Sequence, residues 1–170
     1  MDITVEQLTD VSIYVEHIYQ GDLPSQYLLL SKSVPWQDWM QTWLQYLSSS
    51  TQLIPDCELS LRLNSDRQIQ ALNHQYRSIN QPTDVLAFAA TESDILIPQD
   101  IGEPLYLGDI VISLDTALKQ ATAQNHPLIK ELAWLSSHGL LHLIGWDHPD
   151  ELSLQQMLNK QEELVNLLNF

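Results

Sequence analysis

The sequence feature that most limits how this chain can fold is a set of three histidines near its C-terminus, His138, His142 and His148. The first two are four residues apart, so on a helix they lie one turn apart on one face, with Cβ atoms about 5–6 Å apart. Gly145 stands where a helix usually ends, because glycine takes the left-handed conformation without a Cβ clash. We therefore predict a helix that ends near residue 144, followed by a reversal that brings His148 back towards the other two.

Three imidazoles arranged in this way predict a metal centre. Neutral histidines bind zinc at about 2.0–2.1 Å, and three protein ligands leave the fourth tetrahedral position open for water, which is typical of a catalytic site. The single cysteine, Cys57, excludes an internal disulfide and a Cys-rich zinc finger. We expect one Zn2+ per chain, held by His138, His142 and His148. The alternative is three core or surface histidines that share this spacing by chance.

The spacing also matches part of a protease motif. Metzincins carry His-Glu-x-x-His-x-x-Gly-x-x-His, and this chain has the three histidines and the glycine in register. Gly139, however, stands where those proteases keep a general-base glutamate, and a glycine cannot accept a proton. A metallopeptidase is therefore a weaker alternative.

The charge of the chain limits its partners. Twenty-two Asp and Glu against seven Lys and Arg give a net charge of −15, a field that repels nucleic acid and anionic membranes. Binding of RNA would need a local basic patch, expected among Arg62, Arg67 and Arg77, or delivery by a partner. The acidic start lacks a signal-peptide pattern, and the longest apolar helical stretch, over 132–146, is too short to cross a bilayer. We therefore expect a soluble cytoplasmic protein without a membrane partner.

Hydrophobic periodicity predicts an α+β domain. Strands are expected over 11–15, 58–63, 84–88 and 105–112, with a turn or bulge at Gly108, and helices over 36–47, 66–76, 115–124, 128–144 and 149–168. Residues 27–35 show no clear period, and the acidic stretch 91–103 is expected to be a solvated loop. The result is a small mixed four-stranded sheet covered by about five helices, with the metal site at the end of a C-terminal helix. We expect residues 1–170 to form a single metal-dependent hydrolase domain.

Local signals set the expected helix ends. Residues 64–66 offer N-cap candidates for the second helix, Asp115 is a candidate cap for the third, and Pro149 suits the first turn of the last. The tryptophans of residues 36–43 recur at helical spacing, and we interpret them as core rather than as a ligand platform.

Three blocks of the sequence resemble the YbeY family of bacterial endoribonucleases and rRNA maturation factors. They are His-Gly-Leu-Leu-His-Leu-Ile-Gly-Trp-Asp-His over 138–148, Tyr-Arg at 76–77 with Pro-Thr-Asp-Val-Leu-Ala-Phe over 82–88, and Leu-Gly-Asp-Ile-Val-Ile over 107–112. The resemblance covers about residues 57–165. The chain departs from the family pattern at Asn80, where an Asp is usual, and at Ala87, where a Ser is usual, while residues 20–35 look like an insertion that is not typical of the family.

The resemblance implies a single-strand-specific, zinc-dependent endoribonuclease acting in rRNA maturation and ribosome quality control. Its implied partners are a ribosomal RNA precursor and the ribosome or a ribosomal protein, with no DNA. It also implies the three histidines as zinc ligands and Arg77 as a functional residue. A non-catalytic ribosome-assembly factor, whose zinc only holds the C-terminal helices together, is the alternative that the acidic charge favours.

A mechanism follows as a hypothesis. Zinc would activate a water molecule and polarise a phosphoryl oxygen, and Arg77 would hold the scissile phosphate in its planar fork. The alternative for Arg77 is a surface ion pair. Asp147 either orients a histidine or caps the last helix. Asp84 and Asp109 are expected to shape turns and are candidates for the wall of the cleft, and His74 is expected to be solvated. The residues leave open whether water or the 2′-hydroxyl of the RNA is the nucleophile.

Overall fold

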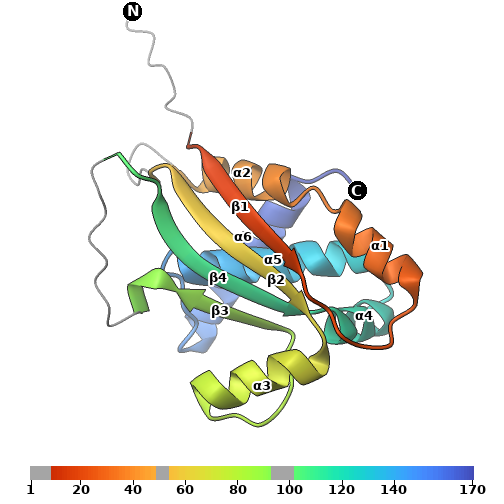
Figure 1. Ribbon diagram of the computed structural model, residues 1–170. Helices are drawn as coiled ribbons and strands as arrows, with labels where there is room; N and C mark the ends of the chain where they lie inside the picture. Colours follow the sequence, from red (N-terminus) through yellow and green to blue (C-terminus); the bar gives the residue numbers. More distant parts are fainter. Residues whose placement is uncertain (1–8, 49–53, 93–101) are drawn as a thin grey trace, which may run out of the picture.

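The computed structural model describes residues 9–48, 54–92 and 102–170, and these confirm the α+β class (Figure 1). Most of the predicted acidic loop, residues 93–101, lies outside the described residues. Within them the chain forms six α-helices and four strands, where the sequence predicted about five helices. The elements in chain order are β1 (Val11–His17), α1 (Ser25–Ser33), α2 (Trp36–Leu47), β2 (Cys57–Asn64), α3 (Asp66–Arg77), β3 (Val85–Ala89), the 3-10 turn η1 (Ala90–Glu92), β4 (Leu105–Ser113), α4 (Leu114–Ala123), α5 (Leu128–Leu143) and α6 (Glu151–Asn166).

The four strands form one mixed sheet in the order β1-β2-β4-β3. β1, β2 and β4 are parallel, and β3 runs antiparallel to β4 at one edge. The predicted bulge is present: the register of β2 and β4 shifts at Gly108, whose φ is +132°. A Cβ at this position would lie 2.1 Å from the carbonyl oxygen of Phe88, so glycine is required both by the backbone and by the neighbouring strand.

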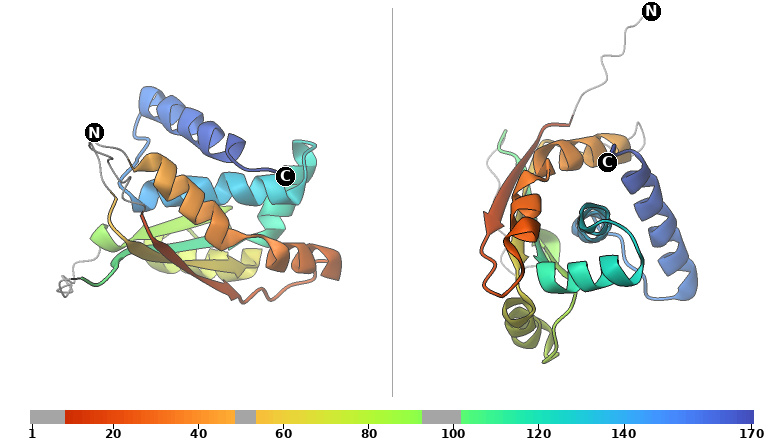
Figure 2. Two further views of the ribbon diagram at one scale, coloured as in Figure 1. Left: turned by 90° about the horizontal axis from the view of Figure 1, so that it is seen from above. Right: turned by 90° about the vertical axis from the view of Figure 1, so that its right-hand side faces the viewer.

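Helix α5 lies at the centre of the helical layer. It packs against β3 and β4 on one side and against α4 and α6 on the other, and Figure 2 shows it enclosed by the other helices of that layer. α3 covers part of the opposite face of the sheet, where Ile69 packs on Leu86 and Val111. The predicted tryptophan stripe of α2 is core, since all three rings are buried. Because α5 is packed on both sides, the helix that carries two of the histidines is held rigidly against the sheet.

One glycine sets how closely α5 approaches the sheet. Gly139 is buried, and a Cβ there would lie 2.8 Å from Cγ2 of Ile110 on β4. Real Cβ contacts are longer than this, so any side chain at this position would push α5 away from β4. The residue therefore faces the sheet.

The outer edge of β1 is covered at its N-terminal end, together with the residues just before it, by three glutamines of α2 spaced one turn apart. We call them the glutamine ladder: Gln37, Gln41 and Gln45. Their Oε1 atoms accept hydrogen bonds of 2.8–3.2 Å from main-chain N–H groups within residues 9–13. The side-chain amides of Gln37 and Gln41 donate back to carbonyl oxygens of the same segment. The side chains thus satisfy main-chain groups that an edge strand otherwise leaves open.

One predicted helix cap is confirmed, and another is wrong. Ser65 caps α3 in a capping box with Gln68, as the sequence indicated. α4 is capped by Ser113, not by Asp115, because the Asp115 carboxylate accepts from the Tyr19 hydroxyl and from a main-chain N–H of α3.

The start of the last helix also differs from the prediction. α6 begins at Glu151 with Asp150 as its N-cap, so Pro149 precedes the helix. The unassigned residues 27–35 contain most of α1, whose only buried residue is Ser31. That residues 20–35 are an insertion relative to the family stays a prediction.

None of the described helices combines the length and the apolar content needed to cross a membrane.

Candidate metal centre

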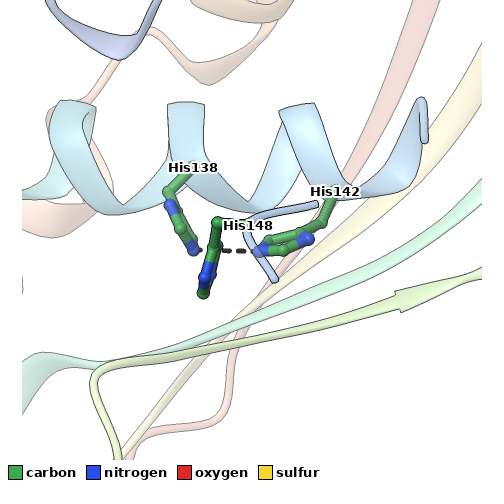
Figure 3. Close-up of side chains that lie close together, drawn as sticks. All are labelled: His138, His142 and His148. Atoms are coloured by element: carbon green, nitrogen blue, oxygen red, sulfur yellow. Dashed lines mark hydrogen bonds between the residues drawn. The ribbon is translucent and has the colours of Figure 1, made fainter. Parts of the chain in front are cut away.

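The three predicted ligands come together at the end of α5 (Figure 3). His138 and His142 lie on successive turns of the helix, and Gly145, with φ of +103°, ends it as predicted. The main-chain N–H of Trp146 closes the reversal by donating to the carbonyl of Leu141 at 2.9 Å. His148 then points back at the other two rings, and one nitrogen from each of the three histidines lies within 4.8 Å of the others.

These distances suit a single metal ion. The Nε2 atoms of His138 and His142 are 3.0 Å apart, and two ligands of a tetrahedral zinc at 2.0–2.1 Å would be separated by about 3.3 Å. A set of three imidazole nitrogens is also a donor set that zinc and similar divalent ions accept. The cluster could therefore hold a metal with only small side-chain movements.

The electrostatics favour the neutral form, which can bind a metal, in two of the three rings. Burial lowers the pKa of His138, and the nearby His148 lowers it further. Burial likewise lowers the pKa of His142, with added repulsion from the other two histidines. A ring with a lowered pKa is neutral at pH 7 and offers a lone pair. His138 and His142 are thus prepared to bind a cation rather than a proton.

A fourth residue, which the sequence analysis missed, contacts the histidine cluster. Gln161 of α6 is buried, and its Oε1 lies 3.0 Å from Nδ1 of His138. A signal for it exists in the sequence: Gln161 interrupts the apolar stripe formed by Met157 and Leu164 on the last helix, where a polar residue needs a partner.

The three histidines line a cleft of about 740 Å3, which they share with Arg77 of α3. Arg77 reaches the cleft across β3: its Nη2 donates to the carbonyl of Ala87 at 3.1 Å, and its guanidinium carbon lies 5.9 Å from the centre of the Phe88 ring. No carboxylate among the described residues lies within ion-pairing distance of it. The alternative of a surface ion pair for Arg77 is therefore not seen in this part of the chain.

Of the three arginines expected to form a basic patch, only Arg77 is among the described residues that line the cleft. Arg62 lies on β2 and pairs with Glu16 at 3.7 Å. Arg67 and Arg77 stand at opposite ends of α3, ten residues or about 15 Å apart along the helix axis. Among the residues described as lining the cleft, Arg77 is the one permanent cation, and Glu92 is an acidic neighbour.

The remaining candidates take lesser positions. Asp147 lines the cleft and accepts from the main-chain N–H of His148 at 2.8 Å, but it does not cap α6, so that alternative is wrong. Asp84 accepts from the main-chain N–H next to it, as expected of a turn residue, and Asp109 accepts from the Tyr106 hydroxyl.

The residue that replaces the protease glutamate is turned away from the cleft. Gly139 faces Ile110 and is not one of the cleft residues. A carboxylate at this position would meet the sheet, so the geometry gives no support to the metallopeptidase alternative.

Comparisons with known proteins agree with the family resemblance seen in the sequence. A family model described as Endoribonuclease YbeY matches residues 28–169. A curated protein of that name from Trichormus variabilis is 56% identical over 135 residues, which is 79% of this chain and 77% of the relative. Another from Picosynechococcus is 45% identical over 161 residues, covering 95% and 96% of the two chains. A solution structure from Thermotoga maritima, 26% identical, superimposes with a TM-score of 0.54 over 91% of this chain and 87% of its own.

Proposed function

Because the chain belongs to the YbeY endoribonuclease family, we propose that it is a metal-dependent endoribonuclease acting on single-stranded RNA. The observation that carries the proposal is that the histidine cluster and Arg77 line the same cleft although they come from α5 and α3, on opposite faces of the sheet. A metal centre and a permanent cation in one cleft are two groups that can stabilise the transition state of phosphodiester hydrolysis.

In this proposal His138, His142 and His148 hold one zinc ion. When bound, zinc lowers the pKa of water and polarises a phosphoryl oxygen. Arg77 binds the scissile phosphate and stabilises the charge that builds on its oxygens, because a guanidinium offers five donors in a plane. The hydrogen bond to the Ala87 carbonyl and the contact with the Phe88 ring hold the guanidinium in place before the substrate arrives. This preorganisation lowers the cost of orienting it during the reaction.

We extend the proposal to the substrate. The resemblance to the family supports ribosomal RNA precursors as the physiological RNA, with a role in ribosome quality control and hence a place in the cytoplasm. The net charge of −15 supports delivery by a partner such as the ribosome or a ribosomal protein, since the chain as a whole repels free RNA.

The acidic charge also favours a second candidate, a non-catalytic ribosome-assembly factor whose zinc is structural. The two functions respond differently to removal of the metal. Loss of RNA cleavage with an unchanged circular-dichroism spectrum supports catalysis. Unfolding on chelation supports the structural ion.

The direct experiment is cleavage of a single-stranded RNA by the zinc-loaded wild type, Arg77→Ala and His142→Ala, purified in parallel. Arg67→Ala is the matched control, because it removes an exposed arginine from the same helix and leaves the cleft intact. We expect wild type and the control to cleave equally and the two cleft variants to lose at least 100-fold, an effect of the size seen when one transition-state donor is removed. Equal cleavage by all four proteins would mean that neither the histidine cluster nor Arg77 is needed for the activity, and would refute the assignment.

A further inference from the structure

Gln161 is a polar side chain inside the apolar contact between α6 and α5. It is 1% exposed, yet both ends of its amide have partners. Oε1 lies 3.0 Å from His138 Nδ1, and Nε2 donates to the main-chain carbonyl of Trp134 at 3.3 Å. A carbonyl only accepts hydrogen bonds, so the contact with Trp134 fixes the NH2 end of the amide there. The end that faces His138 is therefore an acceptor.

An acceptor at this place determines where the proton of His138 sits. A neutral imidazole carries one N–H and one lone pair, and the group bonded to one nitrogen sets which is which. With Gln161 Oε1 against Nδ1, the proton is on Nδ1 and the lone pair is on Nε2. Nε2 is the nitrogen that lies 3.0 Å from Nε2 of His142, inside the cluster.

We propose that Gln161 is a positioning residue of the metal centre, which holds His138 as the Nδ1–H tautomer and so keeps its Nε2 lone pair directed at the metal. The proposal rests on the metal centre proposed above and adds the residue that prepares one of its ligands. It also explains why a polar side chain occupies the buried stripe of α6, since an amide there without a partner would destabilise the fold.

The arrangement joins two helices through the site. His138 belongs to α5, His148 lies in the connection to α6, and Gln161 belongs to α6 itself. A metal bound by the histidines is thus supported from both helices, because ligands that are oriented by an outer hydrogen bond lose less freedom on binding.

The test is zinc affinity, measured without RNA by competition with a chromogenic chelator. Gln161→Leu removes the acceptor and should weaken zinc binding about 10–100-fold, the range known for outer partners of metal ligands. Gln161→Glu keeps an acceptor for the same proton but loses the donor to the Trp134 carbonyl. It should bind zinc as tightly as wild type or more tightly, while the melting temperature of its metal-free form falls. Gln156→Leu makes the same substitution at an exposed position of α6 and should leave the affinity unchanged.

A second measurement reads the tautomer itself. In nitrogen-15 NMR spectra of the metal-free protein at pH 7.5, His138 should be the Nδ1–H form in wild type and in Gln161→Glu. In Gln161→Leu both tautomers should be populated.

Several results would overturn the proposal. They are unchanged zinc affinity in Gln161→Leu, an Nε2–H tautomer of His138 in wild type, or equal losses of zinc affinity in the Leu and Glu variants. The last result would mark Gln161 as a packing residue only. A wild type that binds no zinc would refute the metal centre and this proposal together. Zinc binding that depends on Gln161 in a protein that cleaves no RNA would refute the proposed function alone.

Discussion

The close contact between Gly139 and Ile110 predicts that Gly139→Ala destabilises the protein, which is opposite in sign to the usual effect of replacing a helical glycine with alanine. Replacing a helical glycine with alanine normally stabilises a helix by about 1 kcal/mol. Here the new Cβ would lie 2.8 Å from Cγ2, 3.2 Å from Cγ1 and 3.3 Å from Cδ1 of Ile110, which is fully buried. Overpacking of this kind costs about 1–3 kcal/mol. Gly139→Ala should therefore destabilise the protein by about 1 kcal/mol, or lower its melting temperature by about 2–4 °C for a chain of this size.

The assay is urea unfolding of four proteins: wild type, Gly139→Ala, Ile110→Ala and the double variant. Ile110→Ala alone should cost about 2–5 kcal/mol through the cavity it leaves. In that background the methyl group added at position 139 has room, so the second substitution should become stabilising, with a coupling energy of about 1–3 kcal/mol.

Gly139→Ala that stabilises the protein equally in both backgrounds would refute the close packing of α5 on β4. Zinc affinity gives a second readout, because a helix displaced from the sheet carries His138 and His142 with it. We expect the zinc affinity to be weaker in Gly139→Ala than in wild type.

Three further predictions concern other parts of the molecule. Burial lowers the pKa of His138 and His142 below the ordinary 6.5, so the unfolded chain binds more protons than the folded one in mild acid. The free energy of unfolding of the metal-free protein should therefore fall as the pH drops below about 6.5. Urea titrations should show a weaker pH dependence for His142→Ala. Burial raises the pKa of the Cys57 thiol to about 11. A chromogenic disulfide reagent should therefore leave this thiol unmodified in the native protein at pH 7.5 and react with it fully after denaturation. Rapid reaction in the native protein would contradict the burial of Cys57. Arg77 is the one permanent cation among the described cleft residues, so the affinity for single-stranded RNA should depend weakly on salt. A plot of the logarithm of the binding constant against the logarithm of the salt concentration should have a slope of about −0.7 to −1.4. A slope of about −3 or steeper would mean that RNA binds a basic surface elsewhere.

The histidine cluster could be predicted from the sequence because its geometry is local. A spacing of four residues on a helix, a glycine that ends it and a third histidine three residues later fix most of the arrangement without help from the rest of the chain. The amphipathic helices and the alternating strand β2 were predictable for the same reason, since one face of each is buried.

What the sequence did not show depends on contacts between distant residues. α1 carries four apolar residues in a row over 27–30, of which three pack on the core and Leu29 is exposed, so its residues showed no clear helical period. Asp115 looked like a cap but is engaged by Tyr19, which lies 96 residues earlier in the chain. The strand order β1-β2-β4-β3, which brings Arg77 and the histidines into one cleft, follows from long-range pairing that no local pattern encodes.

The glutamine ladder also has a consequence for how copies of this chain behave towards one another. A bare strand edge acts as a template on which a second molecule can add its own strand, and repeated addition produces fibrils. Along residues 9–13 the side-chain amides of α2 occupy the place of that incoming strand. Over this stretch, which includes the start of β1, the helix of the same chain thus blocks the addition of a strand by a second copy.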